Sequence, residues 1–202
     1  MRLAVFGETN RTKHYLVKRA LDAGYSVDVL ESIGSEPRRG RQGLTTVVGE
    51  IDSTKSMNKV MKNADAVVCL LHDTQDDFDE KSVRIIRSLI SCMEASFIRR
   101  LVIFSYVKTE TRQKTPEHGG LFRSLLSTIV KPNSHPQNIV DLLKETDIDW
   151  TIVGHPPIAT SLVSDLEQPV FDVEIHSKNL AKQIVNQITD VGYLKDTLVL
   201  SA

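Results

Sequence analysis

The turn that follows residues 3–6 is the part of the chain whose residue spacing is best suited to chemistry. Gly7, Asn10 and Lys13 stand at the three positions where a dinucleotide-binding loop normally carries glycine. An apolar run precedes this turn, and apolar residues recur at helical spacing over residues 16–21 behind it. A strand, a tight turn and a helix in this order predict a site where backbone amides bind a pyrophosphate.

Two of the three expected glycines are replaced, and the two replacements have different consequences. Asn10 is a tolerable substitute because asparagine adopts positive φ more often than most residues. Lys13 is too long for the close contact that a third glycine permits, so we expect the helix to shift outward or the ammonium to turn toward a bound phosphate. The alternative is an ordinary strand-to-helix connection that has lost its cofactor, with Lys13 solvated.

The end of the second apolar run bears on which dinucleotide would bind. Glu31 stands where an acidic side chain accepts the ribose hydroxyls of NAD and repels the 2′-phosphate of NADP. Arg38, Arg39 and Arg41 lie in the loop beyond it, and they either remain solvated or close over a 2′-phosphate. The sequence favours NAD slightly over NADP.

Composition and charge argue against several classes of function. The chain has 25 basic and 26 acidic residues, so nucleic acid is not expected to be its main partner. No segment has the apolar length of a membrane span or the pattern of a signal peptide, which predicts a soluble protein. Cys69 and Cys92 are isolated in apolar surroundings and predict reduced core thiols in a cytoplasmic protein. We expect this protein to be a monomer or a homodimer. The histidines lack metal-ligand spacing, so no metal is expected.

The elements that must position the turn alternate between β-rich runs and segments of helical period. This alternation predicts the α/β class, with a doubly wound parallel sheet in a single domain over residues 1–202. The expected strands are residues 2–6, 26–30, 45–48, 66–71, 101–105, 151–153 and 197–200.

Two helices and two irregular segments complete this predicted organisation. Apolar stripes at helical spacing predict core-facing helices over residues 83–93 and 180–188. Residues 108–136, with a short helix expected at 121–129, and residues 155–173 follow the carboxyl ends of strands. Because ligands bind beyond those ends in an open parallel sheet, we expect the two segments to form a small substrate-side lobe.

The chain resembles a compact atypical short-chain dehydrogenase/reductase of the NmrA-like kind, a group that includes biliverdin-IX-beta/flavin reductase. The resemblance spans nearly the whole length, and its landmarks occur in order at residues 4–12, 49–51, 65–71, 101–105, 148–157 and 175–194. It implies a Rossmann-like fold that binds NAD or NADP.

The resemblance also implies which residues would contact the dinucleotide. The pyrophosphate side would be held by Gly7, Thr9, Asn10, Arg11 and Thr12, with Lys13 beside them. The adenine would be flanked by Glu50 and Ile51, and the nicotinamide ribose by Leu70, Leu71 and His72. Three residues depart from the family pattern: Glu50 where Asp is usual, His72 where a small residue is usual, and His155 where Arg commonly precedes the Pro-Pro pair.

Candidate catalytic residues are few. Classical members of the wider superfamily use a Tyr and a Lys four residues later, and no tyrosine here is followed by lysine at that spacing. By the resemblance, the hydroxyl of Ser105 faces the nicotinamide and the substrate. His135 is the second candidate, although an ungapped comparison from Trp150 places Pro136 at the corresponding position.

Two functions follow from this pattern. The first is an NAD(P)H-binding oxidoreductase that transfers hydride to a flat conjugated acceptor such as a flavin or quinone. The second is a non-catalytic NmrA-like regulator or scaffold with a degenerate dinucleotide site, which the departures at Asn10, Lys13, His72 and His155 favour.

Overall fold

The structure is a computed structural model that describes residues 1–7, 10–35, 40–71, 78–106, 135–155 and 170–200. For residues 78–79, 106, 135–138 and 170–175 it describes the backbone alone. The described strands form one seven-stranded sheet in the order β3-β2-β1-β4-β5-β6-β7, and each neighbouring pair is parallel. These strands are β1 (Arg2–Gly7), β2 (Ser26–Glu31), β3 (Leu44–Val48), β4 (Ala66–Leu70), β5 (Arg100–Tyr106), β6 (Asp149–His155) and β7 (Asp196–Val199).

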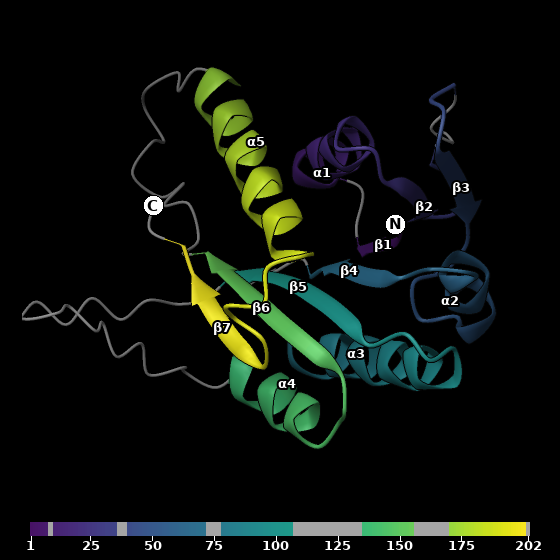
Figure 1. Ribbon diagram of the computed structural model, residues 1–202, viewed down its shortest axis with the longest axis vertical. Coiled ribbons are helices and arrows are strands. Elements are labelled where there is room, and N and C mark those ends of the chain that lie inside the picture. The colour runs from purple at the N-terminus through teal and green to yellow at the C-terminus, as the bar shows by residue number, and fades with distance from the viewer. Residues whose placement is uncertain (8–9, 36–39, 72–77, 107–134, 156–169, 201–202) are drawn as a thin grey trace, which may run out of the picture.

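Helices cover both faces of the sheet (Figure 1). Helices α1 and α5 lie together on one face, and α2, α3 and α4 lie on the other. Their bounds are α1 (Arg11–Asp22), α2 (Thr54–Met61), α3 (Phe78–Ala95), α4 (His135–Lys144) and α5 (Val170–Gln187).

The apolar runs of the strands fill two cores, one on each side of the sheet. In β1, Leu3 and Val5 point toward α1 and α5, whereas Ala4 and Phe6 point toward α2 and α3. Successive side chains of a strand point to opposite faces, so a strand buried on both sides must be apolar at nearly every position. This requirement explains why the central strands appear in the sequence as continuous apolar runs.

The predicted doubly wound parallel sheet is confirmed. All seven expected strands are present, with ends that differ by at most two residues from the predicted ones. The stripe over residues 83–93 faces the core from α3, and α5 packs against α1 through Leu180, Ala181 and Ile184. The segments 108–134 and 156–169, including the short helix expected at 121–129, lie outside the described residues.

The two cysteines are buried and unbridged, Cys69 in β4 and Cys92 in α3, as predicted for core thiols. Burial raises the pKa of the Cys69 thiol to about 12. None of the helices described is long and apolar enough to cross a membrane.

Candidate dinucleotide site

The carboxyl ends of five neighbouring strands meet at one edge of the sheet. Gly7, Glu31, Leu70, Ser105 and His155 lie at or near these ends, in β1, β2, β4, β5 and β6. The chain runs outward from β1 to β2 and β3, then returns to the other side of β1 to form β4. The reversal makes the β1–β4 boundary the topological switch point, where ligands bind in sheets of this type.

Gly7 has the close backbone contact that the first glycine of a dinucleotide loop provides. Its φ is +124°, a conformation that side chains disfavour. A Cβ at this position would stand 2.4 Å from the carbonyl oxygen of Leu70 and 2.9 Å from the Leu70 Cβ. Only glycine therefore lets the chain leave β1 directly against β4.

Asn10 acts differently from the prediction. Its φ is −141° and its ψ 177°, so it is extended, and the expectation of positive φ is wrong. Its side-chain Oδ1 accepts a hydrogen bond of 2.8 Å from the backbone N–H of Lys13 and caps α1. Asparagine is among the preferred residues for this role because its oxygen satisfies an amide of the first turn. Asn10 therefore stabilises the helix start.

Lys13 is fully buried, which excludes the alternative of a solvated side chain. Its ammonium donates to the carbonyl oxygens of Gly7, at 2.9 Å, and Leu30, and it forms an ion pair of 3.1 Å with Glu31 Oε2. The charge also acts on Cys69, whose pKa it lowers against the larger raising effect of burial. The long side chain thus lies beneath the turn and joins the carboxyl ends of β1 and β2.

Glu31, which the sequence also predicted as a site residue, is the ion-pair partner of Lys13. Its side chain is 1% exposed, and its carboxylate points to the face of the sheet that α1 covers. The sequence contained a signal that the two side chains share one face of the sheet, but not that they meet. Lys13 continues the buried helical stripe of Leu16, Val17 and Ala20, and Glu31 continues the alternation of Val27 and Val29 toward the same face.

The other predicted cofactor contacts surround this pair. Arg11 is exposed and Thr12 buried in the first turn of α1, where backbone amides lack acceptors within the helix. Leu70 and Leu71 are buried at the end of β4. Glu50 is exposed and Ile51 partly buried just beyond β3, where the amide of Gly49 donates to the Glu31 carbonyl. Thr9 and His72 lie outside the described residues.

The two predicted catalytic residues follow β5. Ser105 is buried near the end of the strand, and by strand alternation it points to the same face as Leu101 and Ile103. It therefore lies on the face covered by α3 and α4. His135 is the first residue of α4, and its side chain lies outside the described part.

Two histidines meet at this edge of the sheet, a contact that the sequence did not predict. His155 ends β6, and its ring meets the ring of His176 from α5 edge to face, with centroids 4.4 Å apart. Burial, and then the neighbouring His155, lower the pKa of His176. Among the described residues, His176 Nε2 is buried without a hydrogen-bond partner. The spacing of 21 positions between the two residues contained no signal that they would meet.

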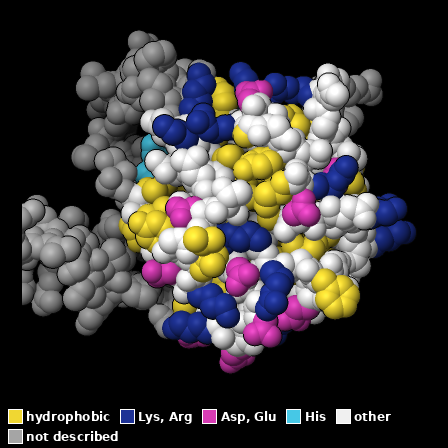
Figure 2. Space-filling view, in the orientation of Figure 1, with side chains coloured by type: hydrophobic (Ala, Val, Ile, Leu, Met, Phe, Trp, Pro, Cys, Tyr) yellow, Lys and Arg dark blue, Asp and Glu magenta, His cyan; other side chains and the backbone are white. Residues whose placement is uncertain are grey.

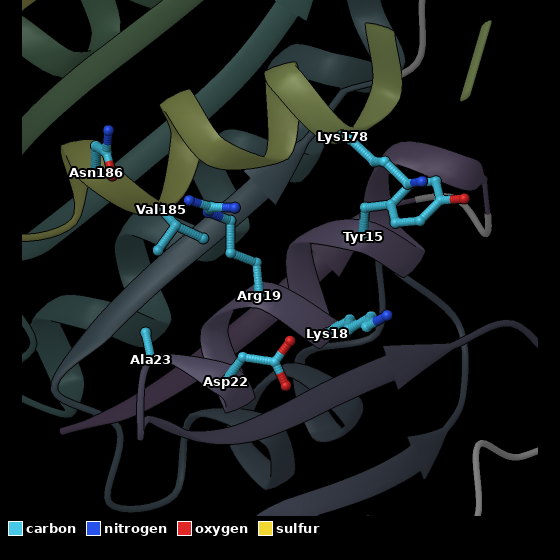
Figure 3. A pocket seen from close by; sticks show the side chains of 8 residues that line it. All are labelled: Tyr15, Lys18, Arg19, Asp22, Ala23, Lys178, Val185 and Asn186. Atoms are coloured by element: carbon cyan, nitrogen blue, oxygen red, sulfur yellow. The ribbon is translucent and has the colours of Figure 1, made fainter. Parts of the chain in front are cut away.

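A separate open groove of about 530 Å³ lies between α1 and α5 (Figure 3). It is lined by Tyr15, Lys18, Arg19, Asp22, Ala23, Lys178, Val185 and Asn186, none of which was a predicted site residue. The ammonium of Lys178 lies 5.3 Å from the centre of the Tyr15 ring. Figure 2 shows basic, acidic and hydrophobic side chains interspersed over the face of the molecule that Figure 1 presents.

Solved structures of low sequence identity share this architecture. The Bordetella bronchiseptica enzyme WbmH, solved in complex with NAD⁺, is 16% identical with a TM-score of 0.66, over 100% of this chain and 75% of that one. The oxidoreductase ylbE from Lactococcus lactis is 17% identical with a TM-score of 0.62, over 98% and 90%. A proposed NADH-flavin reductase from Streptococcus pneumoniae is 13% identical with a TM-score of 0.61, over 98% of both chains. At these identities the likeness shows the fold.

The sequence itself shows the family. A family model described as NAD(P)H-binding matches residues 9–191, which is most of the chain and spans α1, the carboxyl ends of β2 to β6, and α5. Together with the glycine turn at the switch point, the match shows that this chain belongs to the NAD(P)H-binding family.

Proposed function

We propose that the protein is an oxidoreductase that binds NADH or NADPH at the carboxyl edge of the sheet and reduces a flat conjugated acceptor such as a flavin or quinone. The observation that carries the proposal is Gly7, whose φ of +124° and contact with Leu70 provide the tight glycine turn after β1 that dinucleotide-binding proteins of this fold use. A Cβ here would clash with the backbone of β4, so the turn requires glycine. This turn leads into the first-turn amides of α1, which fit a dinucleotide on its phosphate side.

The chain's own residues have defined roles in this proposal. The backbone amides of Arg11 and Thr12, at the positive end of the α1 dipole, would hold the phosphates. Leu70 and Leu71 would exclude water from the nicotinamide side, and Glu50 and Ile51 would flank the adenine. Ser105 would orient the acceptor from the end of β5, with His135 as a second candidate at the start of α4.

A bound NADH or NADPH supplies hydride chemistry, so the protein has little else to provide. A flavin or quinone takes up the hydride together with a proton, which solvent supplies. This division of work agrees with the absence of a tyrosine followed four residues later by lysine in the sequence. Orientation of the two rings is then the main contribution of the pocket.

The sequence preference for NAD depends on Glu31, the residue placed to accept ribose hydroxyls. In the structure the carboxylate of Glu31 already holds the ammonium of Lys13. The same ion pair favours a second candidate function, a non-catalytic regulator whose dinucleotide site has been partly converted to structure.

Ligand-dependent thermal unfolding separates the two functions. At a ligand concentration of about 100 Kd, a protein that binds only in its folded state gains about 2.7 kcal/mol, so NADH, NADPH and NAD⁺ can each be titrated this way. The oxidoreductase requires stabilisation by NADH or NADPH and oxidation of that cofactor with FMN or a quinone. Binding without turnover supports the regulator.

Gly7→Ala is the matched site variant for this experiment. The added methyl would meet the Leu70 carbonyl, so we expect the variant to lose the stabilisation by cofactor. Gly24→Ala is its control, because Gly24 also has positive φ but a Cβ there would meet nothing within 4 Å. If both variants kept full cofactor binding, the turn would not be the phosphate site.

A further inference from the structure

The ion pair between Lys13 and Glu31 lies at the position that determines, in dinucleotide-binding proteins of this fold, whether NADH or NADPH binds more tightly. Glu31 ends β2, which is the position of the acidic residue that accepts the hydroxyls of the adenosine ribose. Its Oε2 instead lies 3.1 Å from Lys13 Nζ, and both side chains are almost completely buried. The carboxylate therefore faces the underside of α1.

Several contacts hold this arrangement in place. Lys13 is anchored by the carbonyl oxygens of Gly7 and Leu30 in addition to the carboxylate, and its own amide is fixed by Asn10. Turning Glu31 outward would leave the ammonium of Lys13 buried with its carboxylate partner gone. Loss of one partner of a buried ion pair is strongly unfavourable, so this rotation is opposed.

The pair also changes the electrostatics of cofactor choice. An unpaired glutamate at the end of β2 repels a 2′-phosphate and so rejects NADPH. A glutamate paired with an ammonium at 3.1 Å forms a unit of no net charge, which removes most of that repulsion. The same contact engages a carboxylate oxygen that would otherwise accept the ribose hydroxyls of NADH.

We infer that the Lys13–Glu31 ion pair is a specificity-determining element that makes the site accept NADPH about as readily as NADH. The inference rests on the proposed function, because it concerns the cofactor of that site. Lys13 acts here as a positioning residue, since its effect on the cofactor passes through Glu31.

The experiment measures the dissociation constants of NADH and NADPH by calorimetry for the wild type and three variants. The variants are Lys13→Met, Glu31→Gln and the double variant Lys13→Met/Glu31→Gln. In the wild type we expect the two constants to agree within a few-fold. In Lys13→Met the released carboxylate should shift the ratio toward NADH by about tenfold or more, since hydrogen bonds to charged groups have that strength. The double variant should lose this shift.

Glu31→Gln gives an answer that does not depend on whether Lys13→Met folds. It keeps the shape of the side chain and removes its negative charge, which leaves the Lys13 ammonium as a net positive charge. We therefore expect NADPH to bind more tightly and the affinity for NADH to stay unchanged. A selective loss of NADH binding in Glu31→Gln, or a strong NADH preference in the wild type, would overturn the inference. Lys18→Met, the same substitution at an exposed position of α1, controls for loss of a lysine.

Failure of the inference is distinguishable from failure of the proposed function. If the wild type binds neither cofactor, the proposed function fails and the inference falls with it. If the wild type binds NADH tightly and NADPH poorly, the site stands and only the role of the ion pair is overturned.

Discussion

Two cations that bind backbone carbonyl oxygens lie at opposite edges of the same sheet: Lys13, fully buried, at the carboxyl edge, and Arg100, partly buried, at the amino edge. Arg100 begins β5 and donates to the carbonyl oxygens of Asp149, at 2.7 Å, Ile188, at 3.2 Å, and Gln187, where α5 ends. It also contacts Thr151 Oγ1 at 2.9 Å. Both cations donate to several backbone carbonyl oxygens at or near the ends of strands or helices.

The two cations differ in whether a carboxylate pairs with them and in the edge of the sheet at which they lie. Lys13 has a buried carboxylate partner, whereas the hydrogen bonds of Arg100 among the described residues go to carbonyl and hydroxyl oxygens. Burial lowers the pKa of the Arg100 guanidinium, and Asp149 and Asp190 raise it. Ligands bind at the carboxyl edge of such sheets, so we expect substitutions at Lys13 to change cofactor binding as well as stability, and substitutions at Arg100 to change stability alone.

The largest expected effect is on the Lys13 side of this comparison. Lys13→Met leaves Glu31 buried without its ammonium, and we expect the free energy of unfolding to fall by about 3–5 kcal/mol. Adding Glu31→Gln should recover most of the loss, because the double variant contains no buried charge at this place. Urea unfolding of the four proteins gives the coupling energy. Additive losses would show that the two side chains do not interact.

Arg100→Met should cost less and should leave the cofactor site intact. We expect a loss of about 2–3 kcal/mol, because several carbonyl oxygens lose a charged donor but remain within reach of water. NADH and NADPH affinities should stay at their wild-type values after correction for the folded fraction. A variant that folded fully but bound cofactor weakly would break the distinction between the two edges.

Two helix caps allow the same comparison with a smaller expected change in the free energy of unfolding. Asn10 caps α1 at the carboxyl edge, and Ser53 caps α2 by accepting from the Ser56 amide at 3.4 Å. Replacing either by alanine should lower the free energy of unfolding by about 1 kcal/mol. Only Asn10→Ala should also weaken cofactor binding, because it loosens the amides expected to hold the phosphates. Equal binding by both variants would remove Asn10 from the site.

The smallest expected effect is a pH dependence at His176. Its pKa lies below the ordinary 6.5 because burial, and then the neighbouring His155, disfavour the charged form. The unfolded chain therefore binds a proton more readily than the native one, so stability falls as pH decreases below about 6.5. His176→Gln should reduce this dependence. Unfolding free energies of both proteins between neutral and mildly acidic pH would test it, and parallel curves would contradict the assignment.

Much of the framework was predictable because it follows from local patterns. Short β-rich runs identified all seven strands, and the stripe in α3 identified its core face. The first glycine of the turn was predicted correctly, since no other residue tolerates its backbone and the contact with Leu70. Only the backbone conformation of Asn10 was predicted wrongly, because asparagine is suited both to positive φ and to helix caps, and the structure uses it as a cap.

The sequence by itself determined the order of strands and helices, the glycine at the switch point and membership of the NAD(P)H-binding family. These depend on short-range spacing and on apolar burial, which can be read along one dimension. Only the tertiary structure decided that Lys13 and Glu31 form an ion pair and that His155 meets His176. The residues of the first pair are 18 positions apart in the sequence and those of the second pair 21 positions. Whether they meet depends on the directions of their side chains, which the packing of α1 and α5 on the sheet sets.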